Sequence, residues 1–334
     1  MRPIRLVVWN VEWFDGLFRD DGTPDRAGPG EPGGASNARR LDAVAHVLRW
    51  LDADAVLVVE APDEGRRRST RRALEGFAAA AGLRATRTII GFPSPTHQEL
   101  ALMHDPAVVE ARHAPGEAPD APRFDGTIDL GREDGLDALG WSKPPLELAL
   151  RVRGVALHLV GVHAKSKSLR GATGAEARRV ADLNRRKQQG QCLWLRRRID
   201  ARLAEATPLV VAGDLNDGPG LDRAERASGR SSVEIVLGRG AGRLVDPHAV
   251  APRTGRGPTT ARFRNAATGG WRHALLDYAM VSAALAPLAR WRILHPEDDA
   301  EAAADPTLRA SLLAASDHFP VVLDLALPPP TSGT

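Results

Sequence analysis

The stretch Leu209-Val-Val-Ala-Gly-Asp-Leu-Asn216 is the starting point for assigning a fold to this 334-residue chain. Its first four residues form a short apolar run, which is typical of a buried strand, and the next four place an acid and an amide where that strand ends. Residues 217–220 continue as a turn. Taken alone, Asp214 and Asn216 are more simply interpreted as turn residues than as part of a site.

Four other segments also place polar residues where an apolar strand ends, and a sixth places an aspartate within a strand. An acid buried in this way needs a partner, because an unpaired buried charge is costly. Each segment alone has an ordinary explanation, such as a strand-end glutamate facing water or a half-buried histidine with a satisfied hydrogen bond. One site explains the ordered set better than six separate accidents. The segments are Trp9-Asn-Val-Glu12, Val58-Val-Glu60, Gly161-Val-His-Ala-Lys-Ser166, Leu276-Asp-Tyr278 and Ser316-Asp-His-Phe-Pro320.

Strands and helices are mixed along the chain, which favours one or more mixed sheets in an α/β fold. Apolar runs predict strands at 4–9, 55–59, 84–90, 100–104, 107–112, 145–152, 155–163, 209–212, 275–281 and 320–325. Helical spacing predicts helices at 37–51, 69–81, 175–206 and 306–315, the first of them capped by Asn37. Arg153-Gly154 is a hairpin signal between two of the strands.

The absence of an internal repeat or of a linker between two halves indicates one folded domain over 1–327, and Pro328-Pro-Pro330 begins a loose tail over 328–334. Stretches rich in Gly, Pro and Asp predict a long exposed loop at 15–36 and an excursion from the sheet at 114–143. With no apolar run of about 18 residues and no secretion signal at the N-terminus, we expect no membrane span and a cytoplasmic protein. We also expect a monomer, and no protein partner is evident. The single cysteine, Cys192, excludes an intrachain disulfide and a multi-cysteine metal site.

Taken in order, the six segments resemble the endonuclease/exonuclease/phosphatase superfamily, which includes DNase I. The resemblance runs from Trp9 to Pro320, and its specific part is Gly-Asp-x-Asn followed by a late Ser-Asp-His. It implies a four-layer α/β sandwich, in which two mixed β-sheets pack face to face with helices outside. It also implies a phosphoester-hydrolysing site at one end of that sandwich.

The resemblance also implies a role for individual residues. Glu60 matches the principal metal ligand, and Asn10 and Glu12 match its neighbours on the first strand, although many members carry Asp at the second position. Oxygen ligands of this kind suit Mg²⁺ or Mn²⁺, and the compact His/Cys cluster preferred by zinc is lacking. A hard cation would offset the negative charge of a phosphodiester.

Attack on the phosphodiester needs a base and hydrogen-bond donors, and the remaining matches supply them. Asp214 resembles the residue that orients or deprotonates the attacking water, and Asn216 its phosphate-contacting companion. The other matches are Asp317 for binding metal or water, His318 and His163 for contacting the phosphate, Asp277 as the partner of His318, and Glu99 as a partner of His163. Such carboxylates raise the pKa of a histidine. We therefore expect activity to fall as the histidines lose protons and as Asp214 gains one.

The substrate is assigned from charge. Residues 164–203 contain twelve lysines and arginines against three acids, a balance that suits a polyanion and fits a solvated helix equally well. Lys165 and Arg170 are the candidate phosphate contacts. Aromatic residues make up only 4% of the chain, so a stacking platform for single strands is not indicated.

These features favour an endonuclease of low sequence specificity that acts on DNA, with RNA also possible. A phosphodiesterase or phosphatase for a small molecule or lipid head group is the alternative. A catalytically inactive nucleic-acid-binding relative is disfavoured, because each core motif position carries a competent residue.

Overall fold

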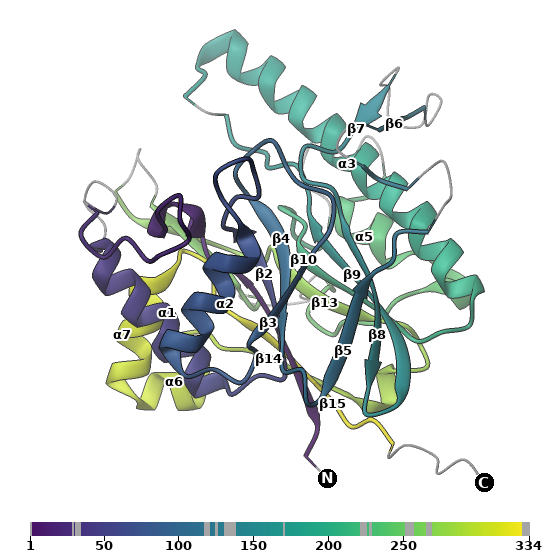
Figure 1. Cartoon of the computed structure of the whole chain (residues 1–334). Coiled ribbons are helices and arrows are strands. Elements are labelled where there is room, and N and C mark those ends of the chain that lie inside the picture. Colours follow the sequence, from purple (N-terminus) through teal and green to yellow (C-terminus); the bar gives the residue numbers. More distant parts are fainter. Residues whose placement is uncertain are drawn as a thin grey trace, which may run out of the picture.

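Two mixed β-sheets lie face to face at the centre of the molecule (Figure 1). The computed structural model describes residues 2–28, 30, 35–116, 121–123, 126–129, 138–169, 171–220, 226, 229–250, 257–264 and 269–328. The first sheet contains, in spatial order, β14 (Ala289–Ile293), β15 (Val321–Leu325), β1 (Ile4–Asn10), β2 (Ala55–Ala61), β4 (Glu99–His104) and β3 (Arg87–Ile90). The second contains β13 (Asp277–Val281), β10 (Leu209–Asp214), β9 (Val155–His163), β8 (Leu146–Val152) and β5 (Val109–His113).

Helices cover the outer face of each sheet. The first sheet carries α1 (Asn37–Leu51), α2 (Thr70–Ala81), α6 (Ala300–Ala304) and α7 (Pro306–Ala315), and the second carries α3 (Gly174–Ala204) and α5 (Ser232–Leu237). One apolar core lies between the sheets, and a further core lies between each sheet and its helices. The predicted four-layer α/β sandwich is therefore confirmed. None of the helices in the described ranges is long and apolar enough to cross a bilayer.

Parallel pairing brings the predicted polar residues to one end of the sandwich. β1 runs parallel to β2, with Asn10 opposite Val59, and β9 runs parallel to β10, with His163 opposite Asp214. β13 runs antiparallel to β10 and begins at Asp277, which lies opposite Asp214. Because the carboxyl ends of parallel strands meet at one edge, the polar residues that follow them are neighbours in space.

Most predicted elements form close to their expected bounds, including the hairpin at Arg153-Gly154, where both residues have a positive φ as a tight turn requires. The predicted cap of α1 is wrong. The Ser36 side chain accepts a hydrogen bond from the Arg39 N–H, whereas the Asn37 amide donates to the carbonyls of Gly16 and Asp25. Asn37 thus ties α1 to the preceding segment.

The stretch 15–36 is not simply an exposed loop. It contains most of a 3₁₀ turn, η1 (Phe14–Leu17), and the side chains of Leu17 and Phe18 are buried. The rings of Phe14, Phe18 and Phe77 meet edge to face, with centroids 5.0–6.2 Å apart. These bulky apolar side chains pack into the core despite the Gly- and Asp-rich sequence around them.

The excursion at 114–143 lies partly outside the described residues, but its last part returns to the core. Short strands β6 (Thr127–Ile128) and β7 (Leu139–Gly140) pair, and Trp141 is buried beside Trp194 of α3. The sequence did not predict these two strands, nor η2 (Gly240–Gly242), β11 (Ala261–Arg264), β12 (Trp271–Ala274), η3 (Ala286–Leu288), β14, α5 and α6.

A buried ion cluster fastens α3 to the second sheet. The Glu147 side chain on β8 is only 1% exposed and accepts hydrogen bonds from Arg198 Nε at 2.9 Å and from Arg202 Nη2 at 2.8 Å. Buried charges are tolerated when they are paired and hydrogen-bonded, and removal of one partner leaves the others uncompensated.

Glu147→Gln is predicted to lower the free energy of unfolding by about 3–5 kcal/mol, because it removes the buried negative charge that the guanidinium groups of Arg198 and Arg202 share. Asp200→Asn is the matched control, since Asp200 pairs with Arg196 on the same helix but is exposed. The control loss is expected to be below about 1 kcal/mol. Urea unfolding of both variants measures the difference, and equal losses would contradict the assignment.

Candidate active site

The Ser-Asp-His segment after α7 is docked onto the end of β1. Trp9 Nε1 donates to the His318 carbonyl at 2.9 Å, and Ser316 Oγ donates to the Asn10 carbonyl at 2.8 Å. Ser316 Oγ in turn accepts from the His318 N–H at 3.0 Å. The tryptophan and serine of the predicted motifs therefore hold the histidine in place.

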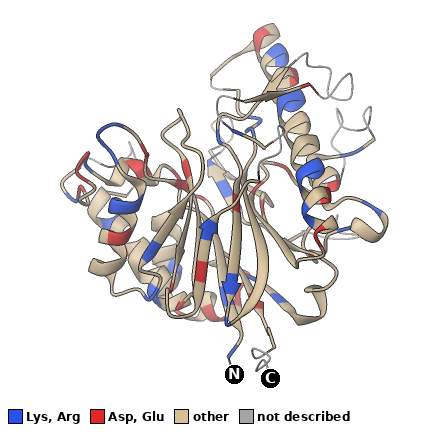
Figure 2. Cartoon of the chain, turned by 45° about the vertical axis from the view of Figure 1, so that its right-hand side comes forward, with Lys and Arg blue, Asp and Glu red and all other residues tan. Residues whose placement is uncertain are grey.

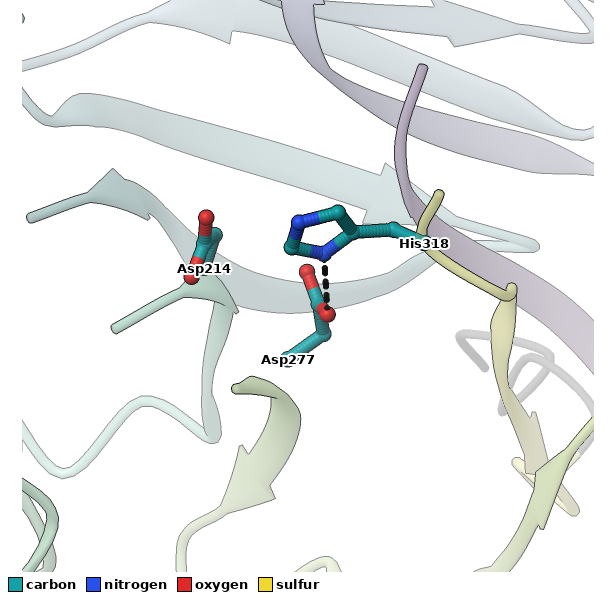
Figure 3. Close-up of side chains that lie close together, drawn as sticks. All are labelled: Asp214, Asp277 and His318. Atoms are coloured by element: carbon teal, nitrogen blue, oxygen red, sulfur yellow. Dashed lines mark hydrogen bonds and ion pairs between the residues drawn. The ribbon is translucent and has the colours of Figure 1, made fainter. Parts of the chain in front are cut away.

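His318 and Asp277 form a buried acid–histidine pair (Figure 3). His318 Nδ1 lies 2.7 Å from Asp277 Oδ2, and both side chains are almost inaccessible to solvent. Thr260, which the sequence did not single out, donates its hydroxyl to the same Asp277 oxygen at 2.7 Å. The threonine oxygen accepts the Asp277 N–H at 3.0 Å, so Thr260 fixes the orientation of the carboxylate.

Asp214 lies between the two histidines and is oriented by Asn216. The Asn216 backbone N–H donates to Asp214 Oδ1 at 2.7 Å, and its side-chain amide donates to Oδ2 at 3.0 Å. The Asn216 amide also reaches the Ala164 carbonyl, at 3.1 Å, which links this turn to the segment after His163. Gly-Asp-x-Asn is therefore more than a solvent-facing turn, because its polar groups point into the site.

The three predicted metal ligands lie together beside Asp214. The Asn10 amide nitrogen is 3.2 Å from Asp214 Oδ2 and 3.5 Å from Glu60 Oε1, and its oxygen accepts the Glu12 N–H at 3.0 Å. The Glu12 carboxylate accepts from the Asp317 N–H at 3.2 Å, and the Glu60 carboxylate accepts from the Trp13 N–H at 2.8 Å. The structure therefore brings together every strand-end residue that the motifs single out.

Strained backbone marks the same segments. Four non-glycine residues at this end of the sandwich, Glu12, Trp13, Glu60 and Asn216, have φ values between 29° and 62°. Such conformations are uncommon outside glycine and cost free energy, and they tend to occur where a side chain must be aimed at a functional site. The strain supports a functional interpretation of these segments.

His163 is held differently from the expectation. Its Nε2 atom lies 2.9 Å from Lys143 Nζ, 3.7 Å from Asp214 Oδ2 and 3.8 Å from Glu60 Oε1. Burial, followed by the nearby charge of Lys143, lowers the pKa of His163 well below its usual range. The lysine ammonium can donate only to a ring nitrogen that carries no proton, so this contact favours the neutral form of His163 rather than the protonated donor that the sequence suggested.

Glu99 does not contact His163 within the described part of the chain. Its carboxylate accepts hydrogen bonds from the Ser94 N–H at 2.9 and 3.0 Å. Burial raises the Glu99 pKa to about 8, so this glutamate carries its proton near neutral pH. Neither its position nor its charge state supports the predicted partnership with His163.

His318 has the opposite electrostatic environment. Burial acts to lower its pKa, but the charge and hydrogen bond of Asp277 outweigh this effect and hold the pKa well above the usual range. Burial, reinforced by the charge of Asp277, raises the pKa of Asp214 to about 7. The site therefore holds a protonated histidine beside a carboxylate that takes up a proton near neutrality.

The crowding of carboxylates at the Asn10 side of the site is compatible with a cation. Burial is the largest cause that raises the Asp317 pKa to about 7; His318 lowers it, whereas the charges of Glu12 and Glu60 raise it. Within the described residues, Asp317 Oδ1 is buried and accepts no hydrogen bond. Crowded carboxylates, and an oxygen that accepts no hydrogen bond and has only His318 Nε2 nearby at 3.7 Å, are features that a hard cation would satisfy.

Asp214, Asp277 and His318 form a second group with metal-like spacing, since their ligand atoms lie within 4.8 Å of one another. A metal ligand must be a neutral imidazole nitrogen, whereas Asp277 stabilises the protonated form of His318. Asp277 Oδ2 is also already occupied by Thr260 and His318. In this structure the group is an acid–histidine pair beside a base, and Asp277 Oδ1, which accepts no hydrogen bond among the described residues, is the oxygen that it could offer to a cation.

The predicted phosphate contacts could be placed only in part. Lys165 is half-buried next to the site, where its backbone N–H donates to Gln191 and its charge contributes to lowering the His163 pKa. Arg170 lies outside the described residues.

Three further residues that the sequence did not single out lie around the site: Lys143, Thr260 and Gln188. Gln188 is 0% exposed and donates to the carbonyls of Lys165, at 2.8 Å, and Asn216, at 2.9 Å.

The buried Glu99 generates a prediction about pH. A carboxyl whose folded-state pKa lies above its unfolded value keeps its proton where the unfolded chain has lost it, so stability falls as pH rises between the two values. For Glu99 this window runs from 4.5 to about 8. Glu99→Gln removes the titration and is expected to flatten the decline. Urea unfolding of the wild type and the variant at about pH 5 and about pH 8 measures this decline in stability. An identical pH dependence of stability in the two proteins would contradict the raised pKa of Glu99.

Comparison with known proteins identifies the family. The sequence model described as the Endonuclease/Exonuclease/phosphatase family matches residues 7–318, whereas no curated protein matches the chain. Truncated Caenorhabditis elegans TDP2 aligns with a TM-score of 0.52 and 15% identity over 97% of this chain and 98% of that one. D. rerio TDP2, in complex with a single strand DNA product, aligns with a TM-score of 0.52 and 15% identity over 97% of this chain and 99% of that one. These structures share its fold, and the chain belongs to the endonuclease/exonuclease/phosphatase family.

Proposed function

We propose that the protein is a divalent-metal-dependent phosphodiester hydrolase, and that a nucleic acid is its substrate. The arrangement that carries the proposal is the buried pair His318–Asp277 beside Asp214, next to the oxygen-rich group of Asn10, Glu12 and Glu60. It combines a base, a cationic hydrogen-bond donor and hard oxygen ligands within one strand-end site.

Asn10, Glu12 and Glu60 would hold Mg²⁺ or Mn²⁺, with Asp317 as a further carboxylate at the same edge. The bound ion would offset the charge of the phosphate and of the departing oxygen. The protein supplies the rest of the chemistry. Because its pKa is raised to about 7, Asp214 is matched to accept a proton from water near neutral pH.

The attacking water forms a bond to phosphorus as its proton passes to Asp214, and the phosphorus–oxygen ester bond breaks. Protonated His318 donates to the phosphoryl oxygen on which negative charge grows, and Asp277 stabilises the charged ring. Asn216 orients Asp214 through two hydrogen bonds. His163 is neutral and lies beside Lys143, so the cation on this side of the site is the lysine.

A nucleic acid substrate is supported by what surrounds the site. The aromatic side chains that are exposed within the described ranges, Trp13 at 51% and Trp271 at 48%, both lie at this end of the sandwich. Trp13 adjoins Glu60, and Trp271 belongs to the β11–β12 hairpin, which bonds to the Asp317 carbonyl through the Arg262 N–H at 2.8 Å. Two arginines of that hairpin, Arg262 and Arg264, lie over the Trp271 ring at 4.3 and 5.0 Å.

Exposed tryptophans stack on bases, and arginines contact phosphates. The low overall aromatic content is therefore a poor guide to base stacking, because the exposed tryptophans of the described residues lie near the site. D. rerio TDP2, which shares the fold, has been crystallised with a single strand DNA product. We infer an endonuclease of low sequence specificity, and a small phosphoester remains the alternative substrate.

Asp214→Asn is predicted to lower kcat by about 10²–10⁴-fold, because it removes the base while it keeps the shape of the side chain. The fold should survive, since burial already disfavours the Asp214 charge. The matched control is Asp246→Asn, another buried aspartate with a pKa raised by burial, whose carboxylate accepts the Ala279 N–H away from the site.

The assay compares plasmid DNA, RNA, and small mono- and diesters with Mg²⁺, Mn²⁺ or EDTA. Wild-type turnover in Asp214→Asn would contradict the assignment of the base. Turnover of the small esters without cleavage of either nucleic acid would favour the alternative substrate.

A further inference from the structure

The two halves of α3 are in different environments. From Asn184 onward the helix buries side chains against the second sheet, whereas none of the residues from Gly174 to Leu183 is buried. In Figure 1 this first part extends beyond the body of the molecule. At 1.5 Å per residue, it projects by about 15 Å. We call the segment Gly174–Lys187 the arm.

The arginines of the two halves also differ in their partners. In the packed half, Arg196 pairs with Asp200, and Arg198 and Arg202 pair with Glu147. On the arm, Arg178, Arg179, Arg186 and Lys187 are exposed, and none forms an ion pair with a residue in the described ranges. In Figure 2 the projecting part of the helix carries several basic segments and fewer acidic ones. The charge of these exposed arm residues is thus available to a partner, whereas that of Arg196, Arg198 and Arg202 is used to fold the protein.

The base of the arm is fastened to the catalytic segments. Asn184 Nδ2 donates to the Ser168 carbonyl at 2.8 Å, in the segment that follows His163. One turn later, Gln188 donates to the carbonyls of Lys165 and Asn216 and accepts from Ser232 Oγ at 3.1 Å. The arm therefore leaves the body beside the turn that carries Asp214, and its direction is fixed by buried hydrogen bonds rather than by a flexible linker.

We propose that the arm binds the sugar–phosphate backbone of a nucleic acid strand whose scissile phosphate lies in the active site. This inference rests on the proposed function and adds to it a second contact region on the substrate. Phosphates follow one another at about 3.4 Å along each strand of a duplex, so the projecting part of the arm, about 15 Å long, spans about four of them. A small phosphoester in the site cannot reach this far.

Charge complementarity selects this partner over others. Within the arm, five lysines and arginines stand against two acids, and the exposed apolar side chains are too few to form a docking face. Arginine and lysine contacts to phosphates are independent of sequence and depend steeply on salt. The arm thus accounts for affinity for a long substrate without sequence specificity.

The test is the double charge reversal Arg178→Glu/Arg179→Glu, compared with Arg197→Glu/Arg290→Glu. The control changes the net charge by the same amount. Arg197 is an exposed residue on the packed half of α3, and Arg290 lies opposite Asp324, at the end of the first sheet where β1 begins. All four side chains are exposed, so both variants should fold, which circular dichroism checks.

For the arm variant, kcat/KM on a plasmid should fall at least about tenfold at low salt, mainly through KM, and the log–log salt slope should become shallower by about 2. Hydrolysis of bis(4-nitrophenyl) phosphate should stay unchanged, and the control should resemble the wild type on both substrates. Unchanged plasmid cleavage in the arm variant, or an equal loss in the control, would overturn the proposal.

Binding separates this proposal from the proposed function. Anisotropy of a labelled DNA duplex reports the contact without any turnover. If the wild type hydrolyses no phosphodiester, the proposed function fails. The role of the arm is still tested, because weaker duplex binding by the arm variant than by the control would support it. Equal duplex affinity of the two variants would exclude that role.

Discussion

The close approach of β9 and β10 at Gly213 sets the geometry on which the candidate site depends. A Cβ atom on Gly213 would lie 2.0 Å from the Val162 carbonyl oxygen, and its φ of 136° is one that other residues rarely adopt. Only glycine permits this contact. The resulting register puts Asp214 opposite His163 on one neighbouring strand and opposite Asp277 on the other. Any larger residue at position 213 would have to separate the strands and move the base away from both groups.

This register gives two histidines at one site opposite electrostatic roles. His318 faces Asp277 and is held in its charged form, whereas His163 is buried beside Lys143 and is held neutral. When the environment raises the pKa of one group and lowers that of a like group in the same site, the first can act as a donor and the second as an acceptor. The sequence alone suggested two equivalent histidines, because it shows which residues are present but not which charges face them.

The features that were predicted correctly from the sequence are those that depend on local pattern. The apolar runs located β1, β2, β9 and β10, and the motifs at their ends located Asp214 and His318. The features that were missed depend on pairing between distant segments. Thr260 reaches Asp277 from across a gap of 17 residues, and Lys143 reaches His163 across 20. Glu99 is the converse case, since its place on β4 is near the site but its carboxylate turns to the Ser94 N–H. The projecting part of α3 has the composition of any solvated helix, and only the structure shows that it buries nothing.

The central claim is that water, activated at Asp214, attacks phosphorus directly. Single-turnover hydrolysis of a phosphodiester in water enriched in ¹⁸O tests it. The account predicts one labelled oxygen in the phosphate product and none in the released alcohol. Label in the alcohol would show cleavage of the carbon–oxygen bond. A first turnover in which neither product carries label would show attack by a group of the protein, and either result would contradict the account.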